Sequence, residues 1–194
     1  MQYSAASTGP ANCCFTTSAF FLKAFVFGGV EDARQLLDEL KAQGTSSSVF
    51  RNIQRIHQNY KFQIEIENEF PQSVEDSVFL EESLKRLHPV RLTSDSNNIR
   101  IEIAEYFKTA KSGLYTVGVQ AFDGRFGGVG HEVGVVIEES GEAYLLDYNR
   151  GIRHYADVNQ FVDHFPKMKK MAYFETYNFN TASISKLCPL RAKL

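Results

Sequence analysis

Two cysteines, one histidine and one aspartate of this chain have the types and the spacing of a nucleophilic catalytic site. Cys13 and Cys14 stand where a long apolar segment begins, and His131 and Asp147 stand in two short apolar runs much further along the chain. A thiolate can attack a carbonyl carbon, an imidazole can move the proton, and a carboxylate that accepts the imidazole N–H fixes its tautomer and orientation. These residue types therefore predict acyl transfer through a covalent cysteine intermediate.

The segment that contains His131 and Asp147 has the pattern of a β-hairpin. Residues 132–137 and 143–146 are apolar strand-like runs, and Glu138-Glu-Ser-Gly141 between them is a turn signal. If the turn centres on residue 139, paired positions sum to 278, which makes His131 and Asp147 direct cross-strand partners. Side chains at opposite positions have Cβ atoms about 4.5–5.5 Å apart. We therefore expect the carboxylate to accept the imidazole Nδ1 proton.

The two cysteines lie at the expected N-terminus of a buried helix. Apolar residues from Cys14 to Val26 recur at helical spacing, and phenylalanines make the other sides of the same segment apolar too, until Gly28-Gly29 ends it. Backbone N–H groups and the positive end of the helix dipole favour a thiolate at such a position. Both Cys13 and Cys14 meet this condition.

The rest of the chain predicts helices first and antiparallel strands second. Further helices are expected over residues 30–40, 50–60, 78–88, 96–110 and 158–165. Strands are expected over 62–66 at a sheet edge, 114–122 and 171–179, with a glycine-rich loop over 124–130 before the hairpin. This order implies an α+β fold in one domain, 1–194, with a helical part over about 1–112 and a sheet part over about 113–194.

Composition and charge are those of an ordinary soluble globular protein. The 194 residues are 43% hydrophobic and 23% charged, with a formal net charge of -2, so no nucleic-acid partner is expected. No apolar run reaches the length of a membrane span, and neither a secretory signal nor a lipidation motif is recognisable. Three cysteines without a spaced framework favour a reducing compartment.

Metal and cofactor sites are not expected. His154 and His164, with Asp157 and Asp163 nearby, do not match zinc-ligand spacing and have no cysteine close in sequence. The glycine cluster before the hairpin precedes a strand, so it lacks the helix N-terminus of a phosphate site. Cys188 is expected to be a structural or incidental thiol.

Taken together, these motifs resemble the papain-fold cysteine proteases, and among them the YopT/AvrPphB family of bacterial effector proteases. Cys14-Phe-Thr-Thr-Ser-Ala19 is similar to the nucleophile run of papain-like enzymes, which favours Cys14 over Cys13 as the nucleophile. The family's histidine strand, Asp-x-Asn-x-Gly turn and phenylalanine-bearing helix resemble, in turn, His131 to Ile137, Asp147-Tyr-Asn-Arg-Gly151, and Val158 to Phe165. Two departures are Tyr148, where the family often has proline, and the doubled cysteine.

The resemblance implies a papain-like fold and a cysteine endopeptidase with the triad Cys14, His131 and Asp147. The Cys14 N–H would form part of the oxyanion hole, with Asn12 or Gln2 as the side-chain donor. It further implies a bacterial effector or toxin domain that acts in the host cell cytoplasm on a specific host protein, such as a small GTPase or a kinase. Two alternatives remain: a glutamine deamidase or transglutaminase-type effector, and a non-catalytic binding module on the same fold.

Overall fold

The computed structural model describes residues 14–65, 71–87, 89–94, 98–123, 127–167 and 179–190. Contacts divide the chain into two compact units. Unit 1 comprises Met1–Lys85, Asp147–Gly151 and Pro189–Leu194, and unit 2 comprises Arg86–Leu146 and Ile152–Cys188. The boundaries of these units differ from the boundary near residue 112 that was expected between a helical part and a sheet part. The single domain over 1–194 stays a prediction.

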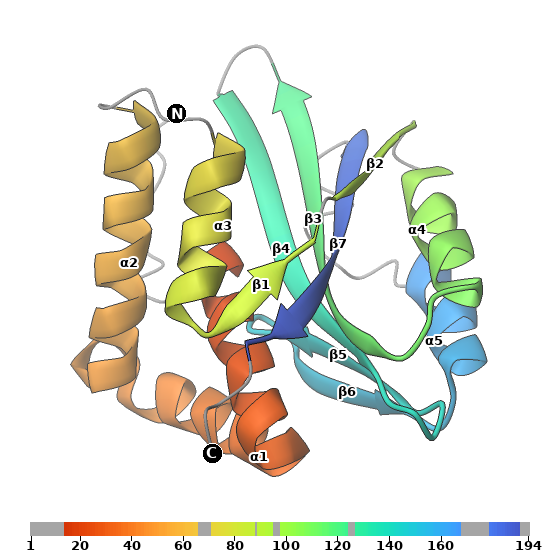
Figure 1. Ribbon diagram of the computed structural model, residues 1–194, viewed down its shortest axis with the longest axis horizontal. Helices are drawn as coiled ribbons and strands as arrows, with labels where there is room; N and C mark the ends of the chain where they lie inside the picture. Colours follow the sequence, from red (N-terminus) through yellow and green to blue (C-terminus); the bar gives the residue numbers. More distant parts are fainter. Residues whose placement is uncertain are drawn as a thin grey trace. The chain divides into compact units, whose positions relative to one another are not determined.

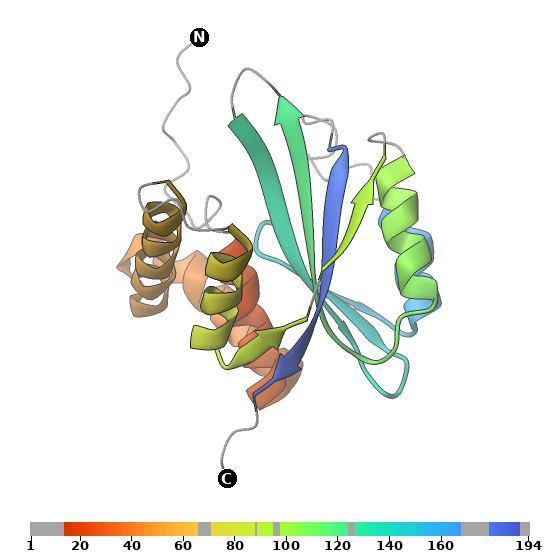
Figure 2. The same cartoon turned by 45° about the horizontal axis from the view of Figure 1, so that its top comes forward.

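Unit 1 is built around three helices. They are α1 (Cys14–Gln43), α2 (Ser48–Glu65) and α3 (Pro71–Glu81), with a short 3-10 turn, Gly44–Ser46, between the first two. The three helices contact one another pairwise, and α2 lies beside α3 in both ribbon views (Figures 1 and 2). Leu40, Phe50, Ile53 and Phe79 are fully buried contributions to the core from all three helices.

α1 consists of two helical arms that meet at a bend. Gly29 has φ 73° and ψ -164°, a left-handed backbone conformation that favours glycine, and it interrupts the helical geometry between the arms. The break predicted at Gly28-Gly29 is therefore confirmed. In the first arm, every residue from Phe15 to Ala19 is buried, as expected for a helix that is apolar on all sides.

By length and composition, α1 could cross a membrane, although the sequence predicts no membrane span. The same properties belong to the core helix of a soluble protein. Phe21 and Leu22 have no exposed surface, and the bend at Gly29 interrupts the helix. These features match a helix that serves as the core of unit 1.

A buried carboxylate next to α3 has a lysine of α1 as its ion-pair partner. Lys23 Nζ lies 2.9 Å from Glu82 Oε2, and the Glu82 side chain is only 5% exposed. Removing one member of a buried pair leaves an unpaired charge that is costly to keep away from water.

We therefore expect Lys23→Met to lower the free energy of unfolding by about 2 kcal/mol, measured by urea denaturation. The double variant Lys23→Met, Glu82→Gln should recover part of that loss, because no buried charge then remains. Arg34→Met breaks the exposed Arg34–Glu31 pair and serves as the control, with an expected loss below about 0.5 kcal/mol. Equal losses from Lys23→Met and Arg34→Met would contradict the prediction.

Unit 2 is built on an antiparallel sheet. Within the described residues the sheet has seven strands: β1 (Leu84–Arg86), β2 (Val90–Thr93), β3 (Gly113–Asp123), β4 (Gly127–Ile137), β5 (Ala143–Asp147), β6 (Gly151–Tyr155) and β7 (Thr181–Pro189). The strand order is β1-β7-β3-β4-β5-β6, and β2 also pairs with β7. Long β3 and β4 pair over their whole length, from Gly113 opposite Ile137 to Asp123 opposite Gly127.

One face of the sheet is covered by α4 (Asn98–Lys108) and α5 (Val158–His164), which lie side by side in Figure 1. The core beneath them takes alternate residues of the central strands, such as Val117, Val135 and Leu145, as the period of two of a β-strand requires. Phe107 of α4 meets Phe161 of α5 edge to face, with ring centroids 5.2 Å apart. The expected helices around 96–110 and 158–165 are both confirmed.

Two of the expected element boundaries are wrong. Residues 62–65 continue α2 instead of forming an edge strand, since no glycine or proline interrupts the segment that begins at Ser48. The helix expected over 78–88 ends at Glu81 because Ser83 takes φ 61°, and Leu84 then begins β1. Both segments are short, and a pattern of only a few apolar residues is compatible with a helix as well as with a strand.

Two further expectations concern the sheet. The glycine-rich segment is in part a strand, because Gly127–Gly130 belong to β4 and pair with β3. The expected strand over 171–179 lies almost wholly outside the described residues. The described strand after it is β7, which contains Cys188 and lies between β1 and β3 in the sheet.

Candidate functional site

The described part of the chain and α1 (Cys14–Gln43) both start at Cys14, whose role as the nucleophile stays a prediction. Its side chain is partly exposed, whereas the residues that follow it are buried. Phe15 packs edge to face on Phe79 of α3, with ring centroids 5.1 Å apart, and so anchors the start of the helix. Cys13, Asn12 and Gln2 lie outside the described residues, so the alternative nucleophile and both oxyanion-hole candidates stay predictions.

His131 lies within β4, where its backbone is opposite Val119 of β3. The residue is only 5% exposed, which is low for an imidazole. Val133 and Val135, on the same side of the strand, belong to the core of unit 2. The pairing of β4 with β3 and the burial of Val133 and Val135 therefore fix the position of the His131 backbone.

Asp147 is the last residue of β5 and begins a tight turn. Its side chain is 1% exposed, and its Oδ1 accepts a hydrogen bond of 3.0 Å from the N–H of Asn149. The Asp147 carbonyl accepts a second bond, of 3.1 Å, from the N–H of Arg150, and Gly151 completes the turn with φ 97°. This Asx-type turn orients the carboxylate and gives a physical reason for the Asp-x-Asn-x-Gly pattern.

The register of the hairpin differs from the expected one. The pairs run from Gly134 opposite Leu146 to Ile137 opposite Ala143, so paired positions sum to 280 and not to 278. The prediction that His131 and Asp147 are direct cross-strand partners is therefore wrong.

The turn explains the shift of the register. Glu138 and Glu142 close the loop through the bond from Glu138 N–H to the Glu142 carbonyl, and Gly141 takes φ 92° inside it. The loop is thus centred on residue 140, a three-residue loop with glycine in the left-handed region. A shift of two residues leaves every side chain on its expected face of the sheet, whereas a shift of one would reverse the faces.

The three candidate residues are distributed over both units. Cys14 and Asp147 belong to unit 1, and His131 belongs to unit 2. The turn that carries Asp147 contacts α1 within unit 1: a Cβ placed on Gly151 would lie 3.7 Å from Leu37 Cδ2. The triad as an assembled catalytic site stays a prediction.

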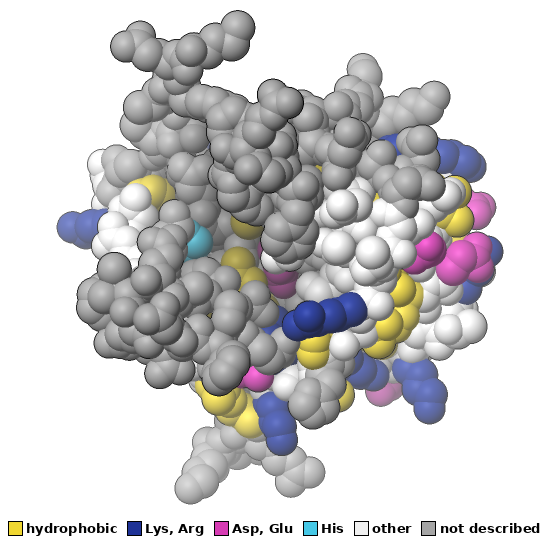
Figure 3. Space-filling model, turned by 90° about the horizontal axis from the view of Figure 1, so that it is seen from above, with side chains coloured by type: hydrophobic (Ala, Val, Ile, Leu, Met, Phe, Trp, Pro, Cys, Tyr) yellow, Lys and Arg dark blue, Asp and Glu magenta, His cyan; other side chains and the backbone are white. Residues whose placement is uncertain are grey.

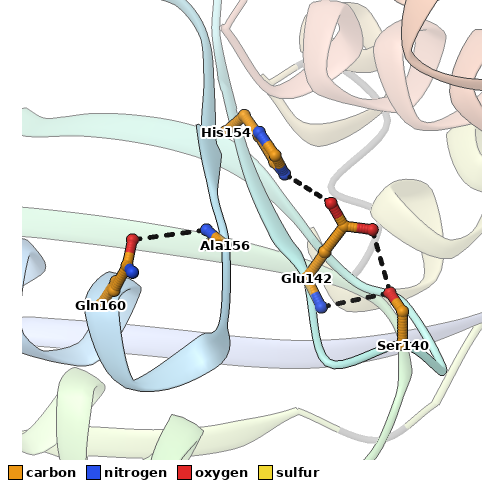
Figure 4. Close-up of polar contacts among 5 residues, drawn as sticks. All are labelled: Ser140, Glu142, His154, Ala156 and Gln160. Atoms are coloured by element: carbon orange, nitrogen blue, oxygen red, sulfur yellow. Dashed lines mark hydrogen bonds and ion pairs between the residues drawn. The ribbon is translucent and has the colours of Figure 1, made fainter.

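Ser140, Glu142 and His154 form a chain of polar contacts near the hairpin, which the sequence did not indicate (Figure 4). Ser140 Oγ donates to Glu142 Oε2 at 3.1 Å, and Glu142 Oε1 lies 2.9 Å from His154 Nε2. The His154 ring stacks on Tyr144, with centroids 4.8 Å apart. Glu142 lies in the turn before β5, Tyr144 lies on β5 and His154 lies on β6, so these contacts tie the hairpin turn to its neighbouring strand.

His164 has a different set of partners. Arg153 NH1 lies 2.9 Å from Nε2, and the Tyr155 hydroxyl lies 2.9 Å from Nδ1. Since a guanidinium can only donate, Nε2 must accept and the imidazole is neutral, with its proton on Nδ1. Asp157 does not contact it but caps α5 by accepting a bond from the Gln160 N–H. Among the described residues, no group of three or more His, Cys, Asp or Glu side chains could hold a metal ion.

This environment predicts an acid-sensitive contribution to stability. Burial, followed by the charges of Arg153 and Lys167, lowers the pKa of His164 below its ordinary 6.5. The unfolded chain therefore binds a proton that the folded chain resists, and stability falls as the pH falls from 6.5 through the lower folded pKa. We expect the free energy of unfolding, measured in urea, to decrease less between neutral pH and about pH 5 in His164→Gln than in the wild type. An identical pH dependence would contradict this.

Charged side chains of both signs are interspersed over the described part of the face in Figure 3. Basic and acidic residues number 21 and 23 in the whole chain. The expectation of no nucleic-acid partner rests on this balance and stays a prediction.

The fold has a known counterpart among solved structures. The chain is similar to the crystal structure of the Pseudomonas avirulence protein AvrPphB, with a TM-score of 0.69 and 16% sequence identity, over 96% of this chain and 97% of that chain. No protein-family model and no curated protein sequence matches the chain. The predicted resemblance is thus confirmed at the level of the fold: the chain has the α+β, papain-like fold of AvrPphB, with a long N-terminal helix followed by an antiparallel sheet.

Proposed function

We propose that this protein is a cysteine endopeptidase of the effector type, with Cys14, His131 and Asp147 as its catalytic triad. The observation that carries the proposal is the AvrPphB-like fold over almost the whole chain together with a cysteine as the first residue of α1. The start of a helix is a position where backbone N–H groups and the helix dipole favour an anion. Two buried polar residues, His131 and Asp147, supply the other groups that the chemistry requires.

The mechanism follows from these three groups. The Cys14 thiolate attacks the scissile carbonyl carbon, and backbone N–H groups at the start of α1 stabilise the resulting oxyanion. As the C–N bond breaks, the His131 imidazolium gives its proton to the leaving amine, which leaves a thioester on Cys14. His131 then takes a proton from water as the water attacks the thioester. The C–S bond breaks, which releases the new carboxyl terminus and restores the Cys14 thiolate and the His131 imidazolium.

The role of Asp147 in this scheme is to orient the histidine. A carboxylate that is held by its own turn can accept the imidazole N–H in one orientation, which fixes the tautomer that Cys14 requires. The bond from Asn149 N–H to Asp147 Oδ1 supports such a role. By the likeness to an avirulence protein, the substrate is proposed to be a host protein and the site of action the host cytoplasm.

The direct test is to identify new protein N-termini in a host-cell lysate treated with wild-type protein or with Cys14→Ala. We expect a small set of new N-termini with the wild type alone. Intact-mass measurement of each target then separates two reaction classes, since proteolysis yields fragments and glutamine deamidation leaves the chain whole. Targets that change in mass without fragmentation would replace the endopeptidase by the deamidase, and no change of any kind would contradict a catalytic function.

A further inference from the structure

Unit 1 has a groove at the bend of α1, the helix drawn from red to orange in Figure 1. Both arms of α1 and the start of α2 line it, and its volume is about 510 Å³. This lies in the range of about 300–1,000 Å³ that is usual for ligand-binding sites. The bend depends on Gly29, whose φ of 73° allows the second arm to turn away from the first.

Much of the lining of the groove is apolar. The apolar lining residues are Phe20, Ala24, Phe27, Leu36 and Val49. Phe27 is 54% exposed and is the most exposed of the large hydrophobic side chains among the described residues. Covering this ring and its neighbours would remove apolar surface from water, which favours an occupant with apolar side chains of its own.

The charged residues of the groove are unevenly compensated. Lys23 lies 2.9 Å from the buried Glu82, so its positive charge is balanced within the protein. Asp32 and Glu39 line the same groove, and neither has a basic ion-pair partner among the described residues: Glu39 accepts a hydrogen bond of 2.8 Å from the neutral Ser47 hydroxyl, and the Asp32 carboxylate lies against the backbone of Gly28. The groove therefore combines apolar side chains with two carboxylates whose charge is not balanced by a described basic residue.

We propose that this groove binds an amphipathic, basic segment of a protein partner. Apolar side chains of the segment would cover Phe27, and its Lys or Arg side chains would pair with Asp32 and Glu39. An amphipathic helix laid in an apolar groove is a common mode of peptide recognition. An anionic lipid surface is the less suitable occupant, because the Asp32 and Glu39 carboxylates would repel it.

The test uses a fluorescein-labelled helical peptide of leucine and lysine as the probe, with the corresponding leucine–glutamate peptide as its charge-reversed control. Fluorescence anisotropy is expected to show saturable binding of the basic peptide and binding of the acidic peptide that is about tenfold weaker or more. Added salt should weaken the binding of the basic peptide, since both acidic residues are near the surface.

Variants then locate the binding site. Asp32→Asn with Glu39→Gln should weaken binding about three- to tenfold, and Phe27→Ala about tenfold. The charge-matched control is Asp38→Asn with Asp163→Asn, both exposed and outside the groove. Ile101→Ala is the matched apolar control, because Ile101 is 48% exposed on α4. Both controls should bind like the wild type, and circular dichroism should show all variants equally folded.

Four outcomes would overturn the proposal. Equal binding of both peptides would show that the groove is an apolar surface without charge selectivity. The same conclusion would follow if the double variant at Asp32 and Glu39 bound the basic peptide as tightly as the wild type does. Sedimentation with phosphatidylcholine vesicles that Phe27→Ala abolishes would make the occupant a lipid surface. Self-association of the protein that Phe27→Ala abolishes would make it a second copy of the chain.

Discussion

Cys14→Ala is expected to lower the rate of substrate cleavage by about 10⁴-fold or more, to the level of the uncatalysed background. The thiolate is the attacking atom in the proposed mechanism, and alanine offers no nucleophile in its place. The measurement is the rate at which fragments of an identified target appear. Cys13→Ala is the matched control and should retain activity, because the run Cys14-Phe-Thr-Thr-Ser-Ala19 has its cysteine at the nucleophile position of the papain-like pattern.

The reactivity of the thiol tests the same assignment without a substrate. We expect iodoacetamide at about pH 6 to label Cys14 faster than Cys188, a partly exposed thiol on β7 that serves as the internal reference. His131→Ala should bring the two rates close together, since the imidazole then no longer favours the thiolate. Loss of activity in Cys13→Ala with full activity in Cys14→Ala would move the nucleophile by one residue. Equal labelling of Cys14 and Cys188 in the wild type would contradict the triad and favour a binding module.

The second large effect is expected at Asp147. Asp147→Asn should lower kcat by about 10²- to 10⁴-fold, because an amide can hold the histidine in the wrong tautomer and does not stabilise its cation. Asparagine keeps a side-chain oxygen, so the turn bond from the Asn149 N–H can persist and the fold should survive. The ratio of kcat in the variant to that in the wild type is the quantity to measure.

Asp157→Asn is the matched control for this substitution. Asp157 also accepts a backbone N–H through its Oδ1, from Gln160 at 2.9 Å, but it lies in the α5 cap and has no part in the proposed chemistry. We expect it to retain wild-type kcat with a similar or smaller change in stability. If both variants keep full activity, Asp147 is a turn residue and the orienting group lies elsewhere.

The sequence predicts well those elements whose signals are local and long. The helix that begins at Cys14, its interruption at Gly29, the helix around 98–108 and the two apolar hairpin strands all have the periodicity that their burial requires. Asp147 to Gly151 likewise has the composition of the turn that it forms. Weaker, shorter patterns such as residues 62–66 misled, because a few alternating residues fit a helix as well as a strand.

The register of the hairpin shows why local sequence patterns do not predict which residues face each other at the candidate site. His131 lies within β4 and Asp147 at the end of β5, and their pairing depends on which residues the loop contains. Gly141 enters the loop with φ 92°, which moves the pairing by two residues. Alternation by itself cannot detect this, since both registers keep the same side chains on the same face.

The sequence by itself determined the α+β class, the cysteine at a helix start and the strand and turn that carry the histidine and the aspartate. Only the tertiary structure decided that β7 lies between β1 and β3, that α3 ends at Glu81 and that the hairpin pairs around residue 140. The physical reason is that the periodicity of apolar residues reports only which face of a helix or strand is buried. Strand order and register depend on hydrogen bonds between distant segments and on single backbone conformations such as those of Ser83 and Gly141.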